Sequence, residues 1–157
     1  MRTITDWLTE YGESHTNQTN KLIHWVCVPA IFFSVTALLY SIKLPFAIGG
    51  VGGVPVNVAF ITIALVIAYY ATLSLTLAIG MLLFSSACLF LCYTLEQAAF
   101  MPLWLVGVII FVTAWVGQFY GHKIEGKKPS FLKDIQFLMI GPAWLMSFIY
   151  KKIGIQL

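Results

Sequence analysis

The sequence has very few charged side chains: Asp, Glu, Lys and Arg make up 10% of its 157 residues, and hydrophobic residues make up 60%. Between Lys43 and Glu96 no side chain is formally charged. A soluble domain carries roughly 25% charged residues, and a charge-free run of this length suits two successive membrane crossings. The composition therefore excludes an ordinary soluble domain and indicates an integral membrane protein.

Other features are also missing. The first 21 residues lack the short apolar core of a secretory signal peptide, so we expect them to remain in the mature protein. The three cysteines all lie in apolar segments, where packing is commoner than disulfide formation. The net charge of +3 comes mainly from lysines at 123–133 and 151–152, which flank apolar segments. This arrangement indicates membrane topology and no nucleic-acid partner.

Residues 3–15 have an amphipathic pattern. Their apolar side chains recur at the spacing of one helical face: Ile4, Trp7, Leu8 and Tyr11. This spacing predicts a helix that lies in the membrane interface and is capped by Thr3 or Thr5. Four residues further along the same face comes His15, which we therefore expect to point toward the membrane or the helix bundle.

Four apolar segments are predicted to cross the membrane, at residues 22–42, 55–71, 75–95 and 102–120. Residues 43–55 are rich in Gly and Pro and are expected to form a loop, with Pro55 starting the second crossing. A tight turn is expected at 72–74, and Glu96 and Gln97 mark the loop before the fourth crossing. The last apolar stretch, 135–150, is interrupted by Gly141 and Pro142, which predicts a broken, re-entrant or interfacial helical hairpin.

The predicted fold is thus an all-α integral membrane protein with one membrane domain over residues 1–157. It comprises an interfacial helix and turn (1–20), a four-helix transmembrane bundle (21–122), and a basic loop with the apolar hairpin (123–157). With four crossings, the amino end and the 123–133 loop share one side, which carries most of the basic residues. That side is predicted to be cytoplasmic, in a bacterial inner membrane or in the endoplasmic reticulum of a eukaryote.

The chain has three histidines, and this topology places all three at the cytoplasmic interface. His15 and His24 cannot share a ligand on one unbroken helix, since nine residues put them half a turn out of phase. The intervening residues 17–20 are turn and N-cap material, and a reversal there would fold His15 back onto His24, with Asn20 capping the next helix. His122 lies just after the end of the predicted fourth crossing. We therefore expect the three imidazoles to meet.

Imidazole suits iron, zinc and copper, and a histidine and carboxylate set with open positions is typical of non-haem iron sites. Glu125 is the natural carboxylate, either as a ligand or bonded to a ligand histidine, although it could equally pair with a nearby lysine. Gln118 lies one turn before His122. Any one histidine alone would more often be a hydrogen-bonding interface residue than a ligand. Further polar candidates lie nearby in the predicted site: Asn17, Asn20, Asp134 and Gln136.

Two blocks of the chain resemble a known family: Tyr11-Gly-x-x-His15-x-Asn17-x-x-Asn20-x-x-Ile23-His24-x-x-Cys27-x-Pro29 and Gln118-Phe-x-Gly121-His122-x-x-Glu125-x-x-x-Pro129. Both blocks and their spacing are similar to those of the small membrane 2-hydroxy-fatty-acid dioxygenases first known from yeast. The chain departs from the yeast-type pattern at Thr16, which replaces a second histidine, at Gln18, which replaces a proline, and in the 130–131 pair after the last proline.

The resemblance implies an iron(II) centre held by His15, His24 and His122. It also implies oxidative shortening of a long-chain 2-hydroxy fatty acid by one carbon, with dioxygen as co-substrate and chelation of the iron by the acid's hydroxyl and carboxylate. Two other classes remain open from the residues themselves. One is a non-enzymatic transporter or lipid-binding bundle with a histidine site for metal or protons, and the other is a purely structural membrane partner. The first would need polar residues through the membrane interior, and residues 43–96 offer few beyond Asn57 and scattered hydroxyls. The second leaves the meeting of the three histidines unexplained.

Overall fold

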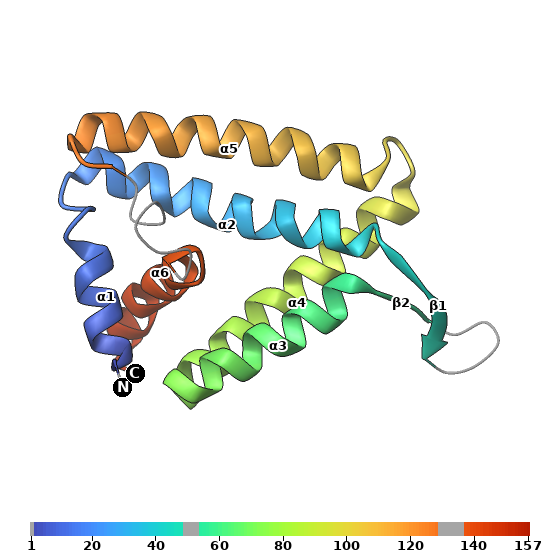
Figure 1. Ribbon diagram of the computed structural model, residues 1–157, viewed down its shortest axis with the longest axis horizontal. Coiled ribbons are helices and arrows are strands. Elements are labelled where there is room, and N and C mark those ends of the chain that lie inside the picture. The colour runs from blue at the N-terminus through green and yellow to red at the C-terminus, as the bar shows by residue number, and fades with distance from the viewer. Residues whose placement is uncertain (1, 49–53, 129–136) are drawn as a thin grey trace.

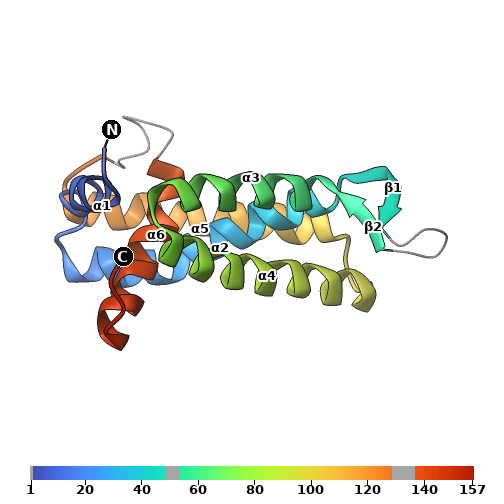
Figure 2. The ribbon, with the colours of Figure 1, turned by 90° about the horizontal axis from the view of Figure 1, so that it is seen from below.

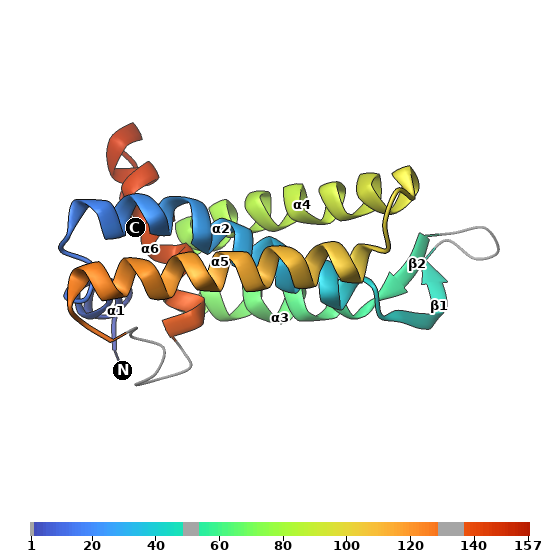
Figure 3. The ribbon, with the colours of Figure 1, turned by 90° about the horizontal axis from the view of Figure 1, so that it is seen from above.

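The computed structural model describes residues 2–48, 54–128 and 137–157, which form six helices and one two-stranded sheet. Helices α2 (Gln18–Tyr40) and α5 (Leu103–Glu125) run antiparallel, side by side (Figures 1 and 3). Helices α3 (Val58–Leu73) and α4 (Leu75–Ala98) form a second pair below them in Figure 1. Helices α1 (Ile4–Gly12) and α6 (Phe137–Ile153) gather at one end, also seen in Figure 2.

Three of these helices have the length and apolar composition that a membrane crossing needs: α2, α4 and α5, of 23, 24 and 23 residues. Helix α3 is also apolar but has only 16 residues. At about 1.5 Å per residue, α3 spans roughly 24 Å, less than a hydrocarbon core of about 30 Å. The architecture is therefore that of a helical membrane protein with three long apolar helices and a shorter one.

Helix α1 forms where the amphipathic pattern predicts it. Thr3 is its N-cap: the Thr3 hydroxyl accepts from the Asp6 amide, and the Asp6 carboxylate accepts from the Thr3 amide at 2.8 Å. This reciprocal pair satisfies backbone donors that a helix start otherwise leaves unpaired. The apolar face is buried, with Ile4, Trp7 and Tyr11 each 7% exposed or less.

Glycines on α5 allow it to approach α2 closely. A Cβ added at Gly121 would clash with Asn20 Oδ1, and one at Gly117 would lie 2.7 Å from Cys27 Sγ. Small residues at such contacts let two apolar helices pack backbone to backbone, the usual device in membranes. The close pairing holds the start of α2 against the end of α5.

The loop predicted at residues 43–55 is wrong at both ends, because β1 (Lys43–Ile48) and β2 (Val54–Asn57) pair as antiparallel strands, and its middle part, 49–53, lies outside the described residues. Strand-forming side chains flank the glycines, and Pro55 is tolerated because a two-stranded sheet has only edge strands. The second apolar helix does not start at Pro55. It starts at Val58, because Asn57 caps it by accepting from the Phe60 amide.

Two helices end later in the chain than predicted. Glu96 and Gln97 lie inside the last turn of α4, since both are good helix formers, and Lys43 pairs with Glu96 at 2.9 Å. Helix α5 continues past the predicted end at residue 120 to Glu125, where Gly126 adopts a left-handed conformation with φ 72°. The turn predicted at 72–74 is present, because Ser74 ends α3 and caps α4.

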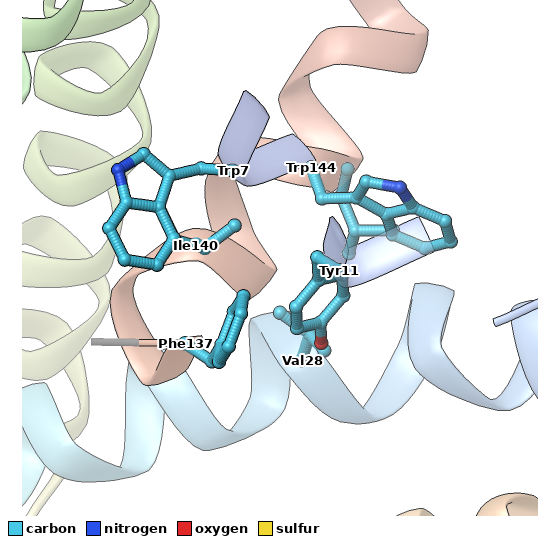
Figure 4. Close-up of a cluster of buried hydrophobic side chains, with 7 residues drawn as sticks. Trp7, Tyr11, Val28, Phe137, Ile140 and Trp144 are labelled. Carbon is cyan, nitrogen blue, oxygen red and sulfur yellow. The ribbon is translucent and has the colours of Figure 1, made fainter. Parts of the chain in front are cut away.

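The predicted break at Gly141 and Pro142 is wrong, because α6 continues through both residues. An interior proline costs a helix about 3 kcal/mol, whereas burying one large apolar side chain gains about 1.5–3 kcal/mol. Helix α6 buries several such side chains against α1 and α2, and this packing outweighs the cost of the proline. The cluster is shown in Figure 4 and comprises Trp7, Tyr11, Val28, Phe137, Ile140, Trp144 and Leu145.

Candidate metal centre

Helix α1 meets the start of α2 and the end of α5 at one end of the molecule (Figure 1). Three imidazoles come together there. One ring nitrogen from each of His15, His24 and His122 lies within 4.8 Å of the other two. The ring centroids are 4.3 Å apart for His15 and His24, and 5.0 Å and 4.9 Å from these to His122. All three side chains are buried, at 1%, 0% and 5% exposure.

Local structure explains each placement. Helix α1 ends at Gly12, and the His15 amide donates to the Gly12 carbonyl at 3.0 Å, which turns the chain back. The cap of α2 is Asn17 and not Asn20 as predicted: Asn17 Oδ1 accepts from the amides of the second and third residues of the helix. His24 therefore lies in the second turn of α2. His122 lies in the last turn of α5.

Backbone carbonyls fix the orientation of two of the rings. His15 Nδ1 donates to the Tyr11 carbonyl at 2.7 Å, and His24 Nδ1 donates to the Asn20 carbonyl at 2.9 Å. A carbonyl oxygen can only accept, so in both neutral rings the proton is on Nδ1 and the lone pair is on Nε2. The two Nε2 atoms lie 3.0 Å apart. Two lone pairs thus face each other.

The surroundings keep His15 uncharged. Its pKa is lowered to about 3, mainly by burial and next by the neighbouring His24, and the hydrogen bond to the Tyr11 carbonyl offsets only part of this. The Tyr11 ring stacks on the His15 ring with centroids 4.2 Å apart and an angle of 12° between the planes. A neutral imidazole with an oriented lone pair is the form that binds a metal.

The residues present fit a metal ion. Two nitrogens bonded to one ion at about 2.1 Å lie about 3.0–3.4 Å apart, and the His15 and His24 Nε2 atoms are 3.0 Å apart. Metal-binding histidines commonly donate the other ring N–H to a carbonyl, as both do here. Among the described residues, the buried His122 Nδ1 has no hydrogen-bond partner. A cation between the facing lone pairs would attract both of them and remove their mutual repulsion.

Glu125 lies near the histidines, but among the described residues the group whose ligand atoms lie within 4.8 Å of one another consists of the three histidines. Its carboxylate accepts from the amides of Thr16 at 2.8 Å and Asn17 at 2.9 Å, and from the Asn20 side chain at 3.0 Å. The Thr16 hydroxyl also donates to it. Glu125 therefore fastens the end of α5 to the turn that follows His15.

The remaining predicted residues are placed as follows. Asn17 is exposed and acts as the helix cap, whereas Asn20 is fully buried and donates to Glu125. Gln118 is 7% exposed and lines an apolar cavity together with His122. Asp134 and Gln136 lie outside the described residues.

Two aromatic residues at the centre were not predicted as part of it. Tyr11 stacks on His15, and its side chain lines the cavity. Trp144 of α6 packs against both, with its ring centroid 5.2 Å from that of His15. The spacing of four residues places Tyr11 and His15 on the same side of the chain, so the sequence could have indicated the contact of Tyr11 with His15. Nothing local in the sequence brings Trp144 to the histidines.

Comparison with known proteins gives one match. A family model described as 2-hydroxy-palmitic acid dioxygenase Mpo1-like matches residues 1–153, nearly the whole chain. Neither the curated proteins nor the solved structures contain a match to the chain.

Proposed function

The chain belongs to the 2-hydroxy-palmitic acid dioxygenase Mpo1-like family, and we propose that it is an iron(II)-dependent membrane enzyme that shortens long-chain 2-hydroxy fatty acids by one carbon. The overall reaction converts the 2-hydroxy acid and dioxygen to the acid one carbon shorter, carbon dioxide and water. The observation that carries the proposal is the meeting of three buried histidines, two of them with Nε2 lone pairs facing across 3.0 Å.

His15, His24 and His122 would hold the iron, since each offers a buried ring nitrogen to the same point. Three neutral imidazoles leave coordination positions open, and iron(II) bound there supplies the redox chemistry that dioxygen needs. The protein's own contribution is orientation and exclusion of water. The two carbonyl hydrogen bonds fix the His15 and His24 rings, and Tyr11 and Trp144 cover His15 on the side of α6.

Glu125 acts in this proposal as a positioning residue. It holds the turn after His15 against α5 through Thr16, Asn17 and Asn20, and so keeps His15 near His122. Gln118 lines the cavity one helical turn before His122 and is proposed to contact the substrate. Asp134 and Gln136 keep the role predicted from the sequence, as further polar residues near the substrate.

The location suits an amphiphilic substrate. His24 and His122 lie near the ends of two long apolar helices, α2 and α5, so in a bilayer they would lie close to the headgroup level. A fatty acid places its carboxylate and 2-hydroxyl at that depth and its tail in the hydrocarbon. From the lysine distribution we propose that this face is the cytoplasmic one.

The test is turnover by the purified protein in nanodiscs, loaded with iron(II) under argon and then exposed to air with 2-hydroxyhexadecanoic acid. We expect pentadecanoic acid and carbon dioxide in equal amounts, and loss of both in His122→Ala. Lys123→Ala is the matched control, since Lys123 is the exposed neighbour on the same turn, and it should keep full activity. Iron bound by the wild type without any shortened acid would overturn the reaction and favour the transporter or lipid-binding alternative.

A further inference from the structure

An apolar cavity of about 300 Å³ begins beside the histidine cluster and extends between α2, α3 and α5, with the start of α6 as a further wall. Its volume is at the lower end of the range for ligand pockets, roughly 300–1,000 Å³. Apolar protein interiors are closely packed, and an empty space of this size would reduce the stability of the fold. The metal centre described above does not fill it.

Polarity in the cavity is concentrated at one end. Tyr11, Gln118 and His122 line it where it meets the histidines. Further along, the two lining threonines, Thr36 and Thr62, donate their hydroxyls to carbonyls of their own helices at 2.9 Å and 3.0 Å. Their hydrogen-bonding capacity is thereby used within the helix, so that part of the wall is apolar in effect.

The cavity is elongated along α2. The residues of α2 that line it run from Val28 to Leu39, and Ala59 of α3 lies at the same far end as Leu39. At about 1.5 Å rise per residue this stretch is roughly 16 Å long. Because a C–C bond of about 1.5 Å advances an extended chain by about 1.3 Å, the cavity matches on the order of 12 methylene groups.

We propose that this cavity binds the acyl tail of the substrate, with the carboxyl end toward His122 and the methyl end toward Leu39 and Ala59, and that its depth sets the preferred chain length. The identity of the head group rests on the function proposed above. The orientation follows from the one polar end, since burying a carboxylate at the apolar end would cost several kcal/mol.

Val35 offers a way to block the cavity halfway. It lines the cavity and is 38% exposed, so a larger side chain there would enter the open space and not the packed core. At roughly 10 Å along α2 from Val28, a Val35→Trp plug leaves room for about eight carbons. Val26→Trp is the matched control, because Val26 lies on the same helix, is 71% exposed and does not line the cavity.

The experiment uses the full-length protein in phosphatidylcholine nanodiscs under argon, so that no turnover occurs. The probes are hexadecanoic and octanoic acids that carry a photoreactive diazirine near the methyl end, and attachment sites are mapped by mass spectrometry. In the wild type we expect the longer probe to label Leu39, Ala59 or Ile63. In Val35→Trp this deep labelling should fall about tenfold or more, while labelling by the octanoic probe stays within about twofold. Val26→Trp should behave like the wild type.

Deep labelling that survives in Val35→Trp, or wild-type labelling confined to outward residues such as Leu83 of α4, would overturn the tail site. The wild-type map alone decides the point if the variant does not fold. The outcome is separable from that of the proposed function: expected labelling without turnover would refute the reaction and leave the tail site standing. Turnover with no change in chain-length preference in Val35→Trp would refute the tail site alone.

Discussion

The Nε2 atoms of His15 and His24 face each other across 3.0 Å, although nine residues and a chain reversal separate the two histidines. Both rings donate Nδ1–H to backbone carbonyls, so neither Nε2 carries a proton when the rings are neutral. Without a cation, this contact sets one lone pair against another in a buried place. A bound metal converts the same contact into a favourable one.

Metal loading should therefore stabilise the protein strongly. At a free metal concentration about 100 times the dissociation constant, linkage adds about 2.7 kcal/mol, which for a chain of this size raises Tm by about 5–10 °C. The measurement is thermal unfolding of the chelator-treated protein with and without iron(II) under argon, together with elemental analysis. His24→Ala should bind no metal and show no shift. A metal-induced shift that persists in His24→Ala would contradict the centre.

Glu125→Gln should weaken metal binding without removing a ligand. The change replaces a charged acceptor of hydrogen bonds from Thr16, Asn17 and Asn20 with a neutral one, and such bonds are each worth about 1.5–3 kcal/mol. Metal affinity should fall about 10–100-fold, in the range seen for supporting residues. Thr16→Val removes one of the same donors and should give a smaller loss in the same direction.

A direct ligand would behave differently. If Glu125 bound the metal itself, Thr16→Val would leave affinity nearly unchanged while Glu125→Gln abolished it. Combining the two substitutions tests the network, because residues that act through one contact give less than additive losses. Additive losses in the double variant would contradict the positioning role. Glu13→Gln is the control for charge alone, since Glu13 is an exposed acid near the same turn.

Features set by local chemistry could be predicted from the sequence. Helix α1, the reversal after His15 and the break at Ser74 follow from side-chain periodicity and capping groups close in the chain. The prediction of Asn20 as the N-cap is wrong by about one helical turn, since Asn17 is the cap. This difference changes the role of Asn20. As a cap, Asn20 would be partly solvated, whereas inside the helix it is buried against α5.

Features that depend on contacts between distant segments could not be predicted. Proline disfavours a helix interior, so Pro142 predicts a break in the helix. The helix continues because α6 packs on α1, a contact that the sequence does not reveal. The sequence singles out Glu125 as a ligand, as a partner of a ligand histidine or as a partner of a lysine, but its hydrogen bonds to Thr16 on a distant segment could not be predicted. Thr16 stands where the yeast-type pattern has a second histidine, and in this chain it binds the carboxylate of α5 instead.

Gly121→Ala should disrupt the centre from outside it. The new Cβ would clash with Asn20 Oδ1, so either the buried Asn20 side chain or α5 must move. Movement of Asn20 disturbs its bond to Glu125, and movement of α5 separates His122 from His24. We expect destabilisation of about 1–3 kcal/mol and loss of most metal affinity. Gly12→Ala is the matched control, because its Cβ would meet the Trp144 ring at an ordinary 3.5 Å. Equal metal affinity in the two variants would contradict close packing as the support of the site.

Tyr11→Phe and Tyr11→Leu separate the two contributions of this side chain. Phenylalanine keeps the ring that stacks on His15 at 4.2 Å, whereas leucine removes it, and aromatic pairs of this kind are worth about 0.5–1.5 kcal/mol. Metal affinity should therefore be unchanged in Tyr11→Phe and about 2–10-fold weaker in Tyr11→Leu.

The Tyr11 hydroxyl is lost in both variants. Because Tyr11 lines the polar end of the cavity, KM for the 2-hydroxy acid should rise in both, while Tyr11→Phe keeps its metal. An unchanged KM in Tyr11→Phe would mean that the hydroxyl does not contact the head group. The stacking role would then stand alone, measured by the difference in metal affinity between the two variants.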